Sequence, residues 1–165
     1  MRQTNPFEIF PFYTEDSRGK LTKLSVISDR SVFPLGVLDE YIAYSSMGVF
    51  RGFHRQLSPD GGNKVFFALK GKIELFTLRA EQVERGEYLP IKWMVEENGT
   101  AVVVPEGHFT GYLVLSKEAI IQVKASYPYV PVSQVVIPPR LVWGLESTDT
   151  WILSPQDRGN TSESI

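Results

Sequence analysis

Arg51, His54 and Lys64 are the residues of this sequence best suited to acid–base chemistry. An imidazole takes up and releases protons near neutral pH, and fixed cations nearby stabilise negative charge that develops on a substrate. Removal of a carbon-bound proton requires this combination of groups. A lone histidine among strands is also often a hydrogen-bonded structural residue, so both interpretations stay open at this point.

The elements that carry these residues are expected to be short β-strands. Runs rich in Phe, Val and Ile are bounded by Gly and Pro turns at spacings of about 8–12 residues, which indicates an all-β sandwich or barrel with few or no helices. Residues 80–85 form the one helix candidate, and a hairpin excursion fits them equally well. The expected strands cover residues 7–12, 21–27, 40–45, 48–54, 64–70, 72–79, 90–94, 101–104, 111–115, 119–125 and 132–137.

The composition is ordinary for a globular protein. The 165 residues are 42% hydrophobic and 22% charged, which predicts one domain over residues 1–165. A net charge of -2 gives no indication of nucleic-acid binding, and no apolar run is long enough for a membrane helix. Cysteine is absent, so disulfides and thiolate sites are excluded, and we expect a cytoplasmic protein. The polar residues from about 158 to 165 are expected to form a mobile tail.

Two spaced motifs, in residues 48–71 and 99–110, narrow the fold. Together they resemble the paired motifs of the cupin superfamily, which implies a cupin-type jelly roll, also called a double-stranded β-helix. Metal-binding cupins place two histidines, a carboxylate and a later histidine in these motifs. A divalent metal needs several converging ligands, so we expect no metal and no other cofactor here. The four corresponding positions of this sequence are His54, Gln56, Lys64 and Thr110.

Several local segments resemble one family more closely. Residues 48–56 (Gly-Val-Phe-Arg-Gly-Phe-His-Arg-Gln) are similar to the Gly-Val-Leu-Arg-Gly-Leu-His-aromatic-Gln signature of the dTDP-4-dehydrorhamnose 3,5-epimerase family. Residues 104–116 resemble its Ile-Pro-Pro-Gly-Phe-Ala-His-Gly-Phe-Leu-Val-Leu-Ser segment. Further similarities lie in residues 16–19, 64–71 and 153–157 (Leu-Ser-Pro-Gln-Asp). The resemblance extends over residues 7–157 in one order.

The resemblance implies roles for individual residues. His54 would be the base, Lys64 would oppose the charge of the enolate, and Arg51 would bind a diphosphate, which guanidinium recognises in bidentate fashion. Other residues would contact the substrate, with the last of them at the rim of the pocket. They are Arg18, Gln56, Thr110 and His108.

Two features of the family are not found at the corresponding positions. The family pairs its histidine with an aspartate from a later Asp-Pro element, whereas residues 130–148 contain no aspartate and the nearest carboxylates are Glu146 and Asp149. The carboxylate partner of His54 therefore stays unidentified from the sequence, and without such a partner His54 would be a weaker base. The family's tyrosine lies on the strand that corresponds to residues 120–125, which contain none here. As the acid that returns the proton, we consider Tyr127 and Tyr129 first, and then Tyr112.

These features predict a nucleotide-sugar epimerase or isomerase of deoxysugar and cell-surface polysaccharide biosynthesis. It would act on a nucleoside-diphosphate 4-keto-6-deoxy sugar by proton transfer next to the ketone, at one carbon rather than two. The alternative is a sugar-nucleotide-binding or structural cupin that has lost catalysis. A metal-dependent cupin oxygenase or isomerase fits less well, because three ligand positions are altered. The resemblance also implies a homodimer in which N-terminal strands complete the partner's sheet.

Overall fold

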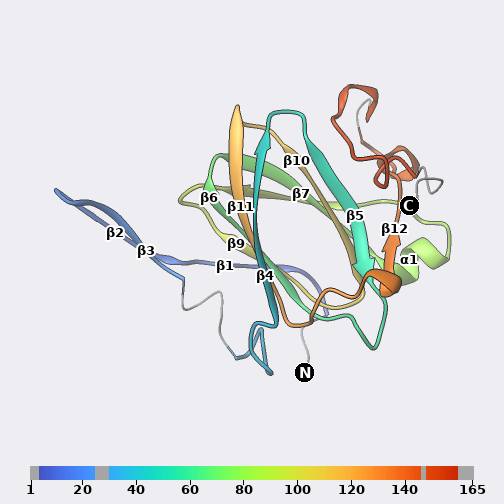
Figure 1. Cartoon of the computed structure of the whole chain (residues 1–165), viewed down its shortest axis with the longest axis horizontal. Coiled ribbons are helices and arrows are strands. Elements are labelled where there is room, and N and C mark those ends of the chain that lie inside the picture. The colour runs from blue at the N-terminus through green and yellow to red at the C-terminus, as the bar shows by residue number, and fades with distance from the viewer. Residues whose placement is uncertain (1–3, 25–29, 146–147, 160–165) are drawn as a thin grey trace.

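A computed structural model describes residues 4–24, 30–145 and 148–159. Its strands form two five-stranded antiparallel sheets and a separate two-stranded hairpin (Figure 1). The first sheet has the order β1 (Phe7–Ile9), β9 (Ala101–Val104), β6 (Lys64–Lys70), β11 (Glu118–Ala125) and β4 (Asp39–Ser46). The second has the order β12 (Gln134–Val136), β5 (Phe50–Gln56), β10 (His108–Val114), β7 (Lys72–Arg79) and β8 (Ile91–Glu96). The predicted all-β jelly roll of the cupin type is confirmed.

A shared apolar core holds the two sheets together. Alternate residues of a strand point to the same face, so each sheet presents one apolar face to the other. Phe66, Ile121 and Val123 from the first sheet pack with Leu75 and Val114 from the second, and all are at most 2% exposed. This packing fixes the positions of β6 and β10, while Phe50 and Phe53 anchor β5 in a second apolar cluster. Most of the candidate site residues lie on these three strands.

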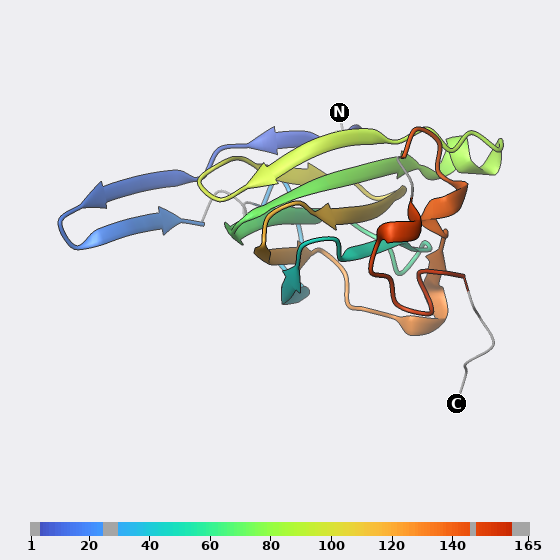
Figure 2. The ribbon, with the colours of Figure 1, turned by 90° about the horizontal axis from the view of Figure 1, so that it is seen from above.

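The hairpin of β2 (Phe12–Asp16) and β3 (Gly19–Lys23) projects away from the two sheets (Figure 1). Figure 2 shows the same projection from above, with the C-terminal segment at the opposite end of the molecule. The predicted strand over 7–12 is divided into β1 and β2 at Pro11, which has no N–H to donate to a sheet. The predicted strand over 21–27 is observed as β3, and residues 25–27 lie outside the described residues.

Helices are short and few, as expected. The candidate at residues 80–85 is the helix α1 (Ala80–Glu84), and the other described helices are three 3-10 turns at Pro131–Ser133, Pro139–Leu141 and Thr148–Thr150. No helix within the described ranges has the length and hydropathy to cross a membrane. Most of the predicted mobile tail, residues 160–165, also lies outside the described residues.

Candidate active site

A bulge in β5 brings Arg51 and His54 to the same face of the sheet. Side chains three residues apart in a regular strand point to opposite faces. Here His54 pairs with Thr110 and Arg51 pairs with Tyr112, so β5 has one more residue than β10 over this stretch. Gly52 lies in the bulge at φ 121°, where an added Cβ would lie 2.5 Å from the backbone of β10. A glycine at this position therefore allows both functional side chains to line one cavity.

The cavity has a volume of about 580 Å³ and opens beside β5 and β10. This volume is within the usual range for a small-molecule site, about 300–1,000 Å³. Apolar residues of β5 and of the C-terminal segment form part of the wall. The polar side chains that matter for chemistry are Arg51, His54, Lys64, Thr110, Tyr112 and Asp157.

His54 has a carboxylate partner, which the sequence had left unidentified. Its Nε2 lies 2.6 Å from Oδ1 of Asp157, whose side chain is 6% exposed, while the His54 side chain is 31% exposed. Asp149, one of the two carboxylates nearest to the missing Asp-Pro element, is exposed, and Glu146 lies outside the described residues. His54 is therefore held by a carboxylate in the folded protein, and a carboxylate in this position orients an imidazole ring.

The C-terminal segment holds Asp157 over β5. Ile152 forms backbone hydrogen bonds with Gly48 and Phe50, at 2.9 Å each, and the ring of Trp151 stacks on Phe50 at 4.9 Å. The Ser154 hydroxyl then accepts a hydrogen bond from the Asp157 backbone N–H at 3.1 Å, which closes a turn. A segment remote in sequence thus supplies the carboxylate that contacts His54.

Lys64 begins β6 and reaches the cavity from the opposite sheet. Its Nζ lies 3.5 Å from Thr110 Oγ1 and 5.9 Å from the centre of the Tyr127 ring. Burial lowers the pKa of Lys64 from its ordinary value of 10.5 to about 8. The side chain is therefore mostly an ammonium at neutral pH, and it carries positive charge into a site of low polarity.

The structure separates the three tyrosines that the sequence left open as the acid. Tyr129 is 56% exposed and does not line the cavity, so the prediction that it takes part in catalysis is not supported. Tyr127 is buried beneath Lys64 and lines a smaller cavity, away from His54. Tyr112 lines the cavity itself; its buried hydroxyl has no partner among the described residues, and burial raises its pKa to about 12. Of the three tyrosines considered from the sequence, Tyr112 is the one that lines the larger cavity.

The structure places the predicted substrate-contacting residues in different parts of the molecule, and only some of them line the cavity. Thr110 lines the cavity of about 580 Å³, whereas Gln56 lies deeper and its Oε1 accepts a hydrogen bond from the Val130 backbone N–H. His108 is 9% exposed rather than at a rim, because β10 begins at His108 and places it in the ladder with β7. Arg18 lies at the turn of the β2–β3 hairpin, paired with Asp16, and is not brought to the cavity of its own chain.

The positions that hold the metal ligands in metal-binding cupins converge in this structure, but the side chains at these positions do not form a set of metal ligands. Lys64 stands beside Thr110 and opposes a divalent cation by its charge. Residues 4–24, 30–145 and 148–159 contain no group of three His, Asp or Glu side chains arranged to hold a metal. Whether the protein is free of metal stays a prediction for elemental analysis.

Comparison with known proteins agrees with this geometry. The family described as dTDP-4-dehydrorhamnose 3,5-epimerase matches residues 5–162. The chain belongs to this family. A curated dTDP-4-dehydrorhamnose 3,5-epimerase from Methanothermobacter thermautotrophicus is 32% identical over 121 residues, which are 69% of this chain and 64% of that protein. The aligned part is thus less than two thirds of this relative's length.

Solved structures of epimerases share the fold of this family member. ChmJ, a 3'-monoepimerase from Streptomyces bikiniensis solved with dTDP-quinovose, superposes with a TM-score of 0.79 at 20% identity, over 94% of this chain and 82% of that one. The dTDP-4-dehydrorhamnose 3,5-epimerase of Elizabethkingia anophelis gives 0.74 at 22%, over 93% and 88%. At these identities the likeness establishes the jelly roll.

Asp157 is the candidate site residue that the sequence did not lead us to name. The signal was present, since residues 153–157 resemble a late Leu-Ser-x-x-Asp segment of the epimerase family. We sought the partner of His54 in the Asp-Pro element instead. A resemblance between segments in the same order along the chain does not show which side chain a segment brings to the site, and the contact spans 103 residues.

Proposed function

We propose that this chain is a metal-independent epimerase that acts on a nucleoside-diphosphate 4-keto-6-deoxy sugar, in deoxysugar biosynthesis. It removes and returns the proton next to the ketone, at one carbon rather than two. The observation that carries the proposal is the contact of 2.6 Å between His54 and the buried Asp157, at the wall of a cavity that Lys64 also lines. A base held by a carboxylate, opposite a cation, suits formation of an enolate.

In the proposed reaction His54 is the base. An ionised Asp157 only accepts hydrogen bonds, so Nε2 of His54 carries the proton and donates it to Asp157. Nδ1 is then the basic nitrogen of the ring, and it takes the proton from the carbon. The electron pair of the broken C–H bond moves onto the ketone oxygen, where the Lys64 ammonium opposes the charge.

Tyr112 is the proposed acid that returns a proton to the other face of the carbon. Its raised pKa keeps the phenol protonated until the enolate needs a proton. The return leaves a phenolate on Tyr112 and an imidazolium on His54, and solvent resets both groups. Arg51 binds the diphosphate at the same cavity, because its guanidinium offers paired N–H donors to phosphate oxygens.

Deuterium incorporation tests the reaction. In D2O, the wild-type protein should introduce deuterium next to the ketone of a dTDP-linked 4-keto-6-deoxy sugar, followed by NMR. His54→Ala should abolish the incorporation and retain binding, whereas Arg51→Ala should mainly weaken binding. Tyr112→Phe should still exchange the proton with solvent but should not invert the carbon centre. Tyr41→Phe changes another tyrosine of the same cavity and is the control. If Tyr41→Phe loses inversion and Tyr112→Phe keeps it, the assignment of Tyr112 is wrong.

Absence of deuterium incorporation in the wild-type protein would refute the catalytic proposal. If the sugar nucleotide still bound in a titration, the alternative of a sugar-nucleotide-binding cupin would replace it. If the wild-type protein neither incorporated deuterium nor bound the sugar nucleotide, both the epimerase and the sugar-nucleotide-binding function would be excluded. Cell fractionation tests the proposed cytoplasmic location.

The proposal includes a homodimer in which the N-terminal strands complete the partner's sheet. Phe10, Phe12 and Leu21, on or next to the projecting hairpin, are 77%, 57% and 53% exposed. Among the strands of residues 4–24, 30–145 and 148–159, β4 lies at an edge of the first sheet, and Tyr44 on it is 70% exposed. Pairing between two copies would cover both surfaces, and it is the arrangement in which Arg18 of one copy can contact substrate in the other.

Light scattering tests the assembly. The wild-type protein should be a dimer at micromolar concentration, and the double substitution Phe12→Ser and Leu21→Ser should shift it toward monomer, because apolar contact area is lost. Val132→Ser is the control, since Val132 is 93% exposed and belongs to the 3-10 turn just before β12, a strand at the end of the molecule away from the hairpin (Figure 1). A wild-type monomer would contradict the proposal.

A further inference from the structure

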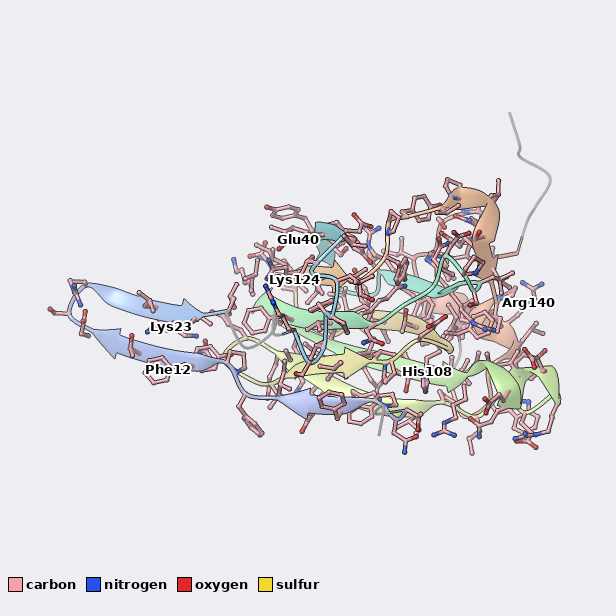
Figure 3. All side chains as sticks on the ribbon, turned by 90° about the horizontal axis from the view of Figure 1, so that it is seen from below. Phe12, Lys23, Glu40, His108, Lys124 and Arg140 are labelled. Carbon is pink, nitrogen blue, oxygen red and sulfur yellow. The ribbon has the colours of Figure 1, made fainter. Side chains whose placement is uncertain are left out.

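A second, much smaller cavity lies behind the candidate active site. The centre of a water-sized sphere can move within about 10 Å³ of this cavity. This volume is near the minimum that one water molecule needs. Lys64 and Thr110 line both this cavity and the larger one, so the two are neighbours. Gln56 and His108 line the small cavity from the β5 and β10 sides. Figure 3 labels His108, at the end of the sheets away from the projecting hairpin.

Three residues of this wall have a buried polar side-chain atom with no hydrogen-bond partner among the described residues: Arg55 (Nε), Gln56 (Nε2) and His108 (Nε2). The Arg55 side chain alternates with that of Gln56 along β5 and lies on the other face of the sheet, over the Phe109 ring, so the two Nε2 atoms are the ones that face the cavity. Gln56 and His108 are 6% and 9% exposed, so open solvent does not satisfy these atoms. An unpaired buried polar atom costs about 1–3 kcal/mol, and nearly all such atoms in folded proteins have a partner. The two atoms therefore indicate a ligand in the cavity.

The second polar atom of each side chain already has a hydrogen bond, and this bond determines whether the free Nε2 atom donates or accepts. Oε1 of Gln56 accepts a hydrogen bond from the Val130 backbone N–H at 2.9 Å, so Nε2 is the amide nitrogen that donates. Nδ1 of His108 lies 3.1 Å from the carbonyl oxygen of Pro105, which can only accept, so Nδ1 carries the proton. Nε2 of His108 is then an acceptor. One donor and one acceptor face a space the size of one water.

We infer that one buried water molecule binds in this cavity, accepts a hydrogen bond from Gln56 and donates one to His108. Water fits because it both donates and accepts, which a metal cation or a simple anion does not. Its second lone pair and second hydrogen match Lys64 and Thr110, which share the wall: the ammonium donates to the water, and the Thr110 hydroxyl oxygen accepts from it. Four partners are the upper end of the number that buried waters typically have.

The water makes His108 a positioning residue for Lys64, an effect on catalysis that rests on the proposed function. An ammonium has three N–H donors, and the one hydrogen-bond acceptor that the structure shows for Lys64 is Thr110 Oγ1, at the long distance of 3.5 Å. With the hydrogens of the water directed to His108 and Thr110, a lone pair of the water faces Lys64. This acceptor stabilises the charged form of Lys64 and fixes its position at the edge of the active site.

The first test is a high-resolution crystal structure of the protein without substrate. One density peak should lie within hydrogen-bond distance of both Gln56 Nε2 and His108 Nε2. Nitrogen NMR should show His108 with its proton on Nδ1. A dry cavity, a protein side chain filling it, or a chloride ion in it would overturn the inference, as would a proton on Nε2.

The second test measures the proton affinity of Lys64 by NMR titration, again without substrate. His108→Leu removes the acceptor of the water, so the pKa of Lys64 should fall by about one unit, a tenfold change, as expected when a charged group loses one hydrogen bond. His108→Gln retains an acceptor oxygen and should stay near the wild-type value. Asp39, whose charge also acts on Lys64, is unchanged in both variants.

An unchanged pKa of Lys64 in folded His108→Leu would overturn the role of His108. If that variant does not fold, Gln56→Met tests the same water from the donor side, with the same expected direction. Neither test requires turnover. The water site can therefore be shown to exist even if the protein does not incorporate deuterium. It can also be shown to be absent from a protein that does incorporate deuterium.

Discussion

Replacement of Asp157 by asparagine should slow deuterium incorporation while leaving sugar-nucleotide binding intact. The amide has nearly the same shape as the carboxylate, so the turn at Ser154 and the packing of the C-terminal segment are retained. It has no charge to stabilise the imidazolium that forms when His54 takes the proton. It also favours the other ring tautomer, because its NH2 group can donate to Nε2.

The size of the effect follows from the contact of 2.6 Å between the His54 ring and Asp157. Two unit charges at this distance interact by about 6 kcal/mol at an effective dielectric constant of 20 and by about 1.6 kcal/mol in water. The His54 side chain is 31% exposed and Asp157 is buried, so the relevant value lies between these limits. At about 1.4 kcal/mol per tenfold in rate, we expect a loss of roughly 100- to 1,000-fold.

The assay is NMR of deuterium uptake at the carbon next to the ketone, under saturating sugar nucleotide, with affinity measured separately by calorimetry. Asp149→Asn is the matched control, because Asp149 is an exposed carboxylate in the same part of the chain. A loss of less than about tenfold in Asp157→Asn, which is below the limit for water, would refute the assignment of Asp157 as the partner of the base.

Three further predictions concern Lys64, the bulge and metal content. Lys64→Ala should lower turnover on the order of 100-fold or more, because one stabilising group for the enolate is removed. Burial lowers the pKa of Lys64 to about 8, so the wild-type rate should fall above about pH 8, where the ammonium is lost. Between about pH 8 and 10.5 the unfolded chain keeps the proton on Lys64 and the folded chain does not. The contribution of Lys64 to stability should therefore rise with pH over this range. Gly52→Ala should cost about 2–5 kcal/mol of unfolding free energy, because φ is 121° and the new Cβ would lie 2.5 Å from β10. Gly86→Ala, at φ 78° with no atom within 4 Å, should cost only about 1–2 kcal/mol in the same denaturant titration, and equal losses would contradict the steric argument. Elemental analysis should find no stoichiometric transition metal, and one Fe, Zn, Mn or Ni per chain would show that prediction to be wrong.

Much of the fold could be predicted from local sequence. Strand-forming runs between Gly and Pro turns give the strands β6, β7 and β9 at their predicted bounds, because a short apolar run bounded by turn residues is typical of a largely buried strand. The order of the two cupin-like motifs then indicated the jelly roll. Arg51, His54 and Lys64 were identifiable because they lie in or next to one continuous motif. The division of the first predicted strand at Pro11 was also readable from the sequence and was missed.

The sequence by itself thus determined the fold class and the three polar residues of the central motif, whereas the tertiary structure decided how the site is completed. Asp157 reaches His54 across 103 residues only because Trp151 and Ile152 pack beside β5. His108 is buried because β10 starts earlier than the turn residues around it suggested. Residue type limits what a side chain can do, but its neighbours come from the pairing of distant strands, and no local pattern records that pairing.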